Sequence, residues 1–113
     1  MLPDSKIDDA KAVSAPFMFV DTGGPRLFLA ACYPGADRRR LVVKVAGGAQ
    51  LLDQQGTFNI GIRNFNAVGI QPAQNGLKAH GTDLGSLSSR TVRRDLTTGL
   101  VTVKTPGTNP CPL

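Results

Sequence analysis

Glycine and proline divide this chain into short segments whose patterns alternate between helical and extended. Gly23-Gly24-Pro25 precedes an apolar run over residues 27–32, and Pro34-Gly35 follows it. Proline removes a backbone donor and glycine accepts a left-handed cap, so this pair should end a helix of at most about three turns. Residues 40–46 are rich in β-branched side chains and stop at Gly47-Gly48, which favours a largely buried strand.

The second half of the chain continues this alternation. Asn59 is placed to cap a second helix that runs to Val68, before a glycine and a proline weaken its continuation. Residues 90–104 put two β-branched segments on either side of a Thr98-Gly99 turn, which predicts a β-hairpin. Helices and strands in this order predict an α+β layered domain.

Both ends of the chain are predicted to be irregular. Residues 1–16 are polar and show no sustained period, which indicates a surface loop. Residues 105–113 contain three prolines and one glycine, which indicates an unpaired tail. The predicted organisation is therefore one domain over residues 1–104 and a Pro-rich tail over residues 105–113.

Length and composition exclude several classes of protein. A chain of 113 residues with 41% apolar content can form one domain that buries roughly 65% of its unfolded surface. A net charge of +5 favours acidic partners, whereas 5% aromatic content and scattered Lys and Arg argue against nucleic acid. The start lacks a secretory pattern, and the most apolar run, residues 27–33, is far below the ~20 residues of a membrane span. We expect a cytoplasmic protein with no membrane insertion.

The reactive side chains form no recognisable cluster. Cys32 and Cys111 make neither a disulfide framework nor a metal-ligand spacing, so we expect no metal site and no cofactor. Cys32 and His80 could form a nucleophile and base pair if the fold brought them together. The apolar run around Cys32 favours a small buried hydrophobe instead, and Gly81 beside His80 favours a turn or strand end.

Five short strings stand in a fixed order along the chain. They are Met1-Leu2-Pro3-Asp4-Ser5, Val45-Ala46-Gly47-Gly48-Ala49, Asn59-Ile60-Gly61-Ile62-Arg63-Asn64, Asp83-Leu84-Gly85 and Arg90-Thr91-Val92. Their order and spacing resemble the CheD family of chemoreceptor glutamine deamidases, and the resemblance spans residues 1–104. It implies the α/β/β sandwich that the family shares with deamidating toxins.

The resemblance also implies a chemistry. The family consists of protein-glutamine glutaminases of bacterial and archaeal chemotaxis, which hydrolyse a glutamine side-chain amide on a methyl-accepting chemoreceptor to glutamate and ammonia. A cysteine thiolate attacks the amide carbon, a histidine activates the thiol and protonates ammonia, and hydrogen-bond donors hold the oxyanion. Water then cleaves the thioester.

This sequence departs from the family pattern at the residues that react. The family's nucleophile lies in a Gly-x-Gly-Ser-Cys segment and its histidine directly before the Met-Leu-Pro string, so both would precede Met1. No Ser-Cys occurs here, His80 matches a different position, and Thr82 and Ser86 replace the usual glutamate and glycine. We therefore expect an N-terminally truncated chain that lacks the family's first strands, contains no catalytic residue and is inactive as given. The alternative is a non-catalytic remnant that acts as a binding module for a CheC-type phosphatase or a chemoreceptor.

The resemblance points to partners as well. The family acts on chemoreceptors and binds CheC, a chemotaxis phosphatase. Its contact with CheC lies near the glycine segment that ends the strand, which here gives Gln50, Leu51 and Leu52 as candidate partner-binding residues. An exposed Leu51-Leu52 pair would mark a docking patch, whereas a buried one would belong to the core.

Two further patterns each leave two interpretations, and the absence of the first strands carries an expectation of its own. Gly47-Gly48 could cradle an anion, although a sharp bend or a close backbone approach suits them better. Asp83 and Arg90 could orient a substrate, but we favour a charge pair that supports the fold. If the first strands are missing, unpaired strand edges should promote association or leave the domain marginally stable.

Overall fold

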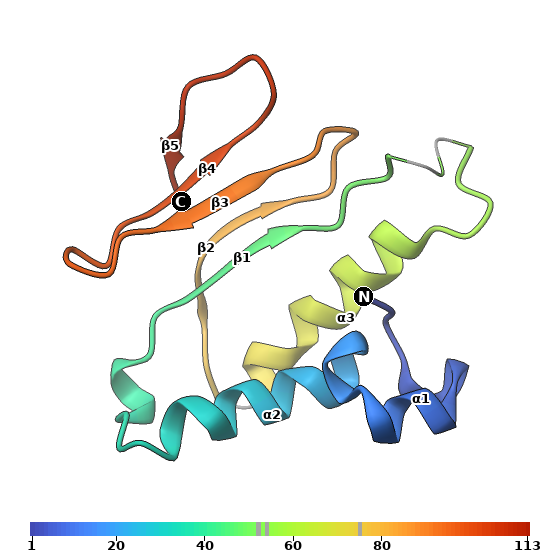
Figure 1. The fold of residues 1–113 in the computed structure, drawn as a ribbon, viewed down its shortest axis with the longest axis horizontal. Coiled ribbons are helices and arrows are strands. Elements are labelled where there is room, and N and C mark those ends of the chain that lie inside the picture. The colour runs from blue at the N-terminus through green and yellow to red at the C-terminus, as the bar shows by residue number, and fades with distance from the viewer. Residues whose placement is uncertain (52, 54, 75) are drawn as a thin grey trace.

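The helices and strands expected from the residue pattern are present in the structure. A computed structural model describes residues 1–51, 53, 55–74 and 76–113. Within these residues, three α-helices lie to one side of two small sheets (Figure 1). The predicted α+β class is therefore confirmed.

The first sixteen residues differ from the predicted loop. They form the 3₁₀ turn η1 (Ser5–Ile7), the short helix α1 (Asp9–Ser14) and the start of a second turn, η2 (Pro16–Met18). Asp8 caps α1 by accepting a hydrogen bond of 2.9 Å from the backbone N–H of Lys11. These elements are short and exposed, so they carry no apolar period that the sequence could reveal.

Helix α2 (Val20–Cys32) contains the apolar run that was predicted to be helical, and it includes Pro25. Its Gly23 is buried, and a Cβ there would lie 3.2 Å from the Cα of Phe17. The hydroxyl of Thr22 donates a 2.6 Å hydrogen bond to the carbonyl of Pro16. Glycine at position 23 thus lets η2 lie directly against the helix.

A βαβ unit follows the short turn η3 (Arg38–Arg40). Strand β1 (Val43–Gly47) pairs in parallel with β2 (Ala79–Leu84), and helix α3 (Ile60–Gln74) connects them. Helix α3 extends six residues beyond the end predicted at Val68. It lies against α2 (Figure 1), and this packing outweighs the low helix propensity of the glycine and proline in its second half.

The predicted hairpin is confirmed, but the prediction of an unpaired tail is wrong. Strands β3 (Thr91–Arg94) and β4 (Val101–Lys104) are antiparallel. Within the tail, β5 (Cys111–Pro112) pairs with β4, and the N–H of Leu113 donates to the carbonyl of Val101 at 2.9 Å. Prolines allow this because β5 is a short edge strand, where a missing donor costs little.

The hydrophobic core of the described residues is small. The apolar side chains buried there are those of Phe19, Val20 and Val103, and Phe19 is the one large side chain that is fully buried. Leucine and valine side chains on α2 and before β1 remain largely exposed, among them Leu27 at 61% and Val42 at 65%. The apolar surface between helices and sheet is therefore incompletely covered by this chain.

Candidate functional site

The structure does not assemble a catalytic pair from the cysteines and the histidine. Cys32 is the last residue of α2 and is half-buried, whereas Cys111 is exposed in β5. His80 lies exposed in β2, where its Nδ1 accepts a 3.3 Å hydrogen bond from the N–H of Val43. Among the described residues, no hydrogen bond joins His80 to either cysteine. The nucleophile and base hypothesis for Cys32 and His80 thus gains no support from the geometry.

The structure does bring together the five strings that carry the resemblance. Asn64 reaches from α3 to the first string, and its Nδ2 donates to the carbonyl of Met1 at 2.8 Å. The carbonyl of Gly47, at the end of β1, accepts from the N–H of Gly85 at 2.9 Å. The side chain of Arg90, in the fifth string, donates hydrogen bonds to Asp83 and Gly85 of the fourth string. Segments that are far apart in sequence therefore form one connected region around the start of α3.

Close backbone contact explains the paired glycines at the end of β1. Gly48 has a φ of 68°, and a Cβ on Gly61 would lie 2.6 Å from the Gly48 carbonyl oxygen. No side chain fits at that distance, so the strand end and the start of α3 require glycine at position 61. This supports the structural interpretation of Gly47-Gly48, a bend with close approach, over an anion cradle.

The first string is held to α2 as well as to α3. Leu2 forms a parallel bridge to Phe19. Its N–H donates to the carbonyl of Met18 at 2.7 Å, and its carbonyl accepts from the N–H of Val20 at 2.9 Å. Ser5 donates to Asp21 twice, from its backbone N–H at 3.0 Å and from its hydroxyl at 2.6 Å. Residues 1–5 are thus fixed at a defined place beside both helices.

Asp83 and Arg90 form the charge pair that the sequence suggested. The Nη2 of Arg90 lies 2.9 Å from the Oδ1 of Asp83, and its Nη1 donates to the carbonyl of Gly85 at 2.8 Å. The Arg90 side chain is only 6% exposed, and its Nε is buried without a partner among the described residues. The pair ties the end of β2 to the start of the hairpin, which supports its assignment to the fold.

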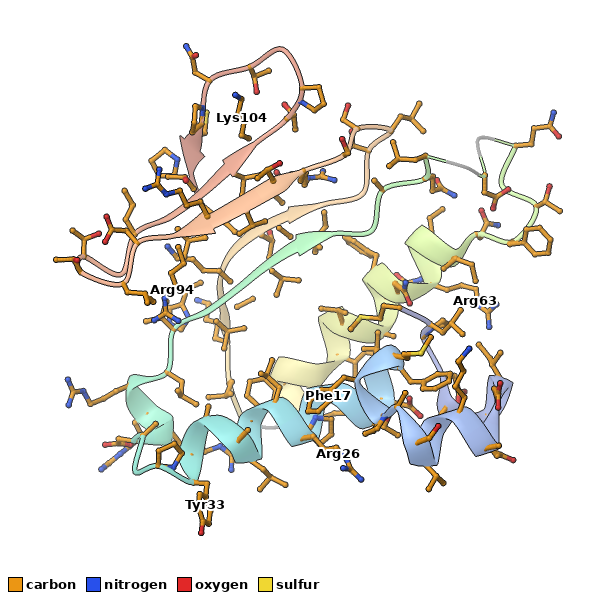
Figure 2. The ribbon with its side chains drawn as sticks, in the orientation of Figure 1. Phe17, Arg26, Tyr33, Arg63, Arg94 and Lys104 are labelled. Carbon is orange, nitrogen blue, oxygen red and sulfur yellow. The ribbon has the colours of Figure 1, made fainter. Side chains whose placement is uncertain are left out.

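An apolar groove runs between α2 and β1. It has a volume of about 610 Å³. Its lining includes Met1, Phe17, Leu27, Phe28, residues 41–46 and Arg94, and the charged side chains among these are Lys44 and Arg94. In Figure 2, Phe17 lies on the side of α2 that faces the sheets, whereas Arg26 and Tyr33 point away from it. No direct signal in the sequence marks this groove, because its two walls come from segments that each resemble ordinary core elements.

The candidate partner-binding residues follow the C-terminal end of β1. Gln50 is anchored: its N–H donates to the carbonyl of Ser86 at 3.0 Å, and its Nε2 donates to the Oδ1 of Asn59 at 3.2 Å. Leu51 is 46% exposed. Leu52 lies outside the described residues. Of the three, Leu51 is thus an accessible apolar side chain next to the anchored Gln50.

Three carboxylates have pKa values below their ordinary range. Partial burial raises the pKa of Asp21, but the Ser5 hydroxyl and backbone donors outweigh it and lower the pKa overall. The pKa of Asp53 is raised by burial and lowered more strongly by the N–H groups of residues 56–59. The hydrogen bond from Arg90 lowers the pKa of Asp83 against a smaller opposing effect of burial. All three favour the ionised carboxylate in the folded state.

These shifts predict an acid-sensitive fold. A carboxylate with a depressed folded-state pKa stabilises the protein above its unfolded pKa, about 4, and this contribution is lost as pH falls through the folded-state value. We expect the urea midpoint to drop as pH is lowered below about 4. The drop should be smaller in Asp83→Asn, measured by circular dichroism across the same pH series. An identical acid dependence in the wild type and Asp83→Asn would contradict the role given to this pair.

Comparison with known proteins assigns the chain to a family. A family profile described as "CheD chemotactic sensory transduction" matches residues 1–105. The chain is 45% identical over 107 residues to "Probable chemoreceptor glutamine deamidase CheD 1" of Syntrophus aciditrophicus, covering 95% of this chain and 67% of the relative. The chain belongs to the CheD family. The "Probable chemoreceptor glutamine deamidase CheD" of Solibacter usitatus is 44% identical over 99 residues, covering 88% of this chain and 59% of that relative.

Membership of the CheD family confirms the resemblance carried by the five strings. The chain spans about three fifths to two thirds of the length of these CheD relatives. None of the helices in the described residues is long and apolar enough to cross a bilayer. The described part also holds no group of three His, Cys, Asp or Glu residues placed to bind a metal ion. What this CheD chain offers is a fixed scaffold and an open apolar groove.

Proposed function

We propose that this chain is the scaffold of a cytoplasmic chemoreceptor glutamine deamidase and that its reactive cysteine and histidine come from polypeptide outside residues 1–113. The observation that carries the proposal is the convergence of the five family strings beside a groove to which Met1 contributes. The names of the CheD relatives supply the substrate, a glutamine on a chemoreceptor. Residues 1–104 are the proposed family domain.

The proposed reaction replaces an amide by an acid. The C–N bond of the glutamine side chain breaks, ammonia leaves, and water supplies the oxygen of the new carboxylate by way of a thioester. This chain would contribute position and charge rather than the nucleophile. Its net charge of +5 attracts an acidic receptor surface, and such attraction raises the rate of encounter at low salt.

Ammonia release tests this proposal. We expect residues 1–113 alone to release no ammonia from a glutamine-bearing chemoreceptor fragment. We expect release when the chain is fused to the third of the Syntrophus aciditrophicus relative that it does not match. Replacing Cys32 by alanine should leave the activity of the fusion unchanged, because Cys32 is half-buried at the end of α2. Activity in the 113-residue chain that disappears in Cys32→Ala would overturn the proposal.

A second proposed function is the docking of a CheC-type phosphatase, favoured by the exposure of Leu51 beside the anchored Gln50. In Leu51→Asp we expect the Kd for a CheC-type phosphatase to rise about tenfold, which corresponds to ~1.4 kcal/mol. Leu96→Asp is the matched control, since Leu96 is 87% exposed in the turn of the hairpin. Calorimetric titration measures both, and equal Kd values in the two variants would refute this docking site.

A further inference from the structure

The chain has more exposed surface than a closed domain of its mass. Its accessible surface is 7989 Å², whereas a folded monomer of 11.9 kDa exposes about 5,900 Å². Its radius of gyration is 15.0 Å, compared with roughly 13 Å for a compact domain of this length. The excess of about 2,000 Å² is the area that one chain buries in a large obligate interface.

Four of the exposed large apolar side chains line the groove between α2 and β1, those of Met1, Phe17, Leu27 and Val42. Leu27 and Val42 line it on opposite sides and are 61% and 65% exposed. Strand β1 hydrogen-bonds only to β2 among the strands in the described residues, so its second edge has no strand partner. A free strand edge beside apolar pockets is the arrangement that accepts an added strand.

Two observations at Met1 indicate which polypeptide would fill the groove. Met1 itself lines the groove, so any residues joined to it start there. The Nδ2 of Asn64 holds the Met1 carbonyl at 2.8 Å, while its Oδ1 is buried and has no donor among the described residues. A buried acceptor without a donor is costly, and a neighbouring N–H from an added segment would satisfy it.

The groove also selects for charge. Its lining contains the cations Lys44 and Arg94, and no Asp or Glu is among the described residues that form it. Arg94 is the end residue of β3 and lies near the start of β1 in Figure 2. An occupant with apolar residues facing the groove and a carboxylate at this end would complement it.

We propose that the groove binds, as a strand added to the free edge of β1, the third of the CheD polypeptide that residues 1–113 do not match. This inference rests on the proposed function, because it places the segment that is to supply the reactive groups. The length of the relatives supports this occupant over a second copy, because 67% of one relative and 59% of the other are covered and the rest of each lies beyond the matched part.

Binding of the segment in trans tests the inference without reference to activity. The probe is the unmatched third of the Syntrophus aciditrophicus relative, carried on a solubility tag and titrated into the 113-residue chain. We expect saturable binding, and in Leu27→Asp a Kd at least about tenfold higher. Leu29→Asp is the matched control, because Leu29 lies on the same helix and is 71% exposed but does not line the groove. It should bind like the wild type.

Hydrogen exchange adds a readout specific to strand addition. On binding, amides of residues 43–47 that do not pair with β2 should gain protection, because an added strand would accept their hydrogen bonds. Circular dichroism should show that both aspartate variants remain folded, since both side chains are largely exposed. No binding, equal loss in the two variants, or unchanged exchange in β1 would overturn the proposal. So would a groove-dependent dimer of the 113-residue chain that excludes the probe.

The two proposals fail in different ways. Binding that depends on Leu27, together with no ammonia release from the fusion, would support the docking site and remove the proposed deamidase function. Ammonia release that is unaffected by Leu27→Asp would support that function and remove the docking site.

Discussion

Replacing Phe19 by alanine is expected to lower the free energy of unfolding by about 3–5 kcal/mol, the usual cost of removing a large buried aromatic side chain. Phe19 is 0% exposed and bridges to Leu2, so it joins the first family string to the start of α2. Its removal leaves a cavity where η2, α2 and residues 1–5 meet. Urea unfolding followed by circular dichroism measures the loss.

The expected loss is large relative to the stability of the whole domain. A domain of this size is stable by about 5–15 kcal/mol, and Phe19 shares the buried apolar core of the described residues with only Val20 and Val103. Phe58→Ala is the matched control, because Phe58 is 71% exposed, and it should change the stability by about 0.5 kcal/mol or less. Equal losses in the two variants would show that the core lies elsewhere.

Replacing Arg90 by methionine is expected to lower the free energy of unfolding by about 1.5–3 kcal/mol, the range for hydrogen bonds to charged groups. The replacement keeps most of the length of the side chain but removes its bonds to Asp83 and to the carbonyl of Gly85. The Gly85 carbonyl would lose its partner, and the hairpin its tie to β2. The same urea titration measures this effect.

A neighbouring arginine provides the control for this prediction. Arg93 is exposed in β3, one strand residue away from the groove-lining Arg94. Arg93→Met should therefore change the stability by no more than about 0.5 kcal/mol. If Arg93→Met were as destabilising as Arg90→Met, net charge rather than the specific pair with Asp83 would account for both results.

Local chemistry made part of this fold predictable from the sequence. The hairpin was predictable because Thr98-Gly99 lies between two β-branched segments, and Gly99 takes a φ of 76° in the turn. Strand β1 was predictable because residues 40–46 are rich in β-branched side chains and are followed by two glycines. Each of these signals is contained within about fifteen residues of chain, so no distant contact was needed to interpret it.

Two of the three errors arose where distant contacts decide the structure. The tail forms β5 because β4 offers it a free edge, and its prolines gave no hint of this. Helix α3 continues past Val68 because α2 packs against it. At the N-terminus, Asp8 caps a helix too short to show an apolar period. In the first two cases tertiary context overrides a weak local preference, whereas α1 was missed because its local signal is short.

The candidate site was less accessible to sequence reasoning than the fold. The order of the five strings revealed the family, but their meeting around the start of α3 depends on the parallel pairing of β1 with β2. The hydrogen bond from Asn64 to Met1 joins the last residue of the third string to the first residue of the first string and has no local signature. The groove lies between α2 and β1, which come from separate parts of the chain, so it became visible only in three dimensions.

The most direct test of the scaffold role is mass spectrometry of the receptor. A chemoreceptor fragment is incubated with the 113-residue chain, with its fusion to the unmatched third of the Syntrophus aciditrophicus relative, or with the fusion carrying Leu27→Asp. We predict conversion of a specific glutamine to glutamate by the fusion, much slower conversion by the Leu27→Asp fusion, and none by the chain alone. Conversion by the chain alone, or a folded fusion that leaves every glutamine intact, would contradict the account.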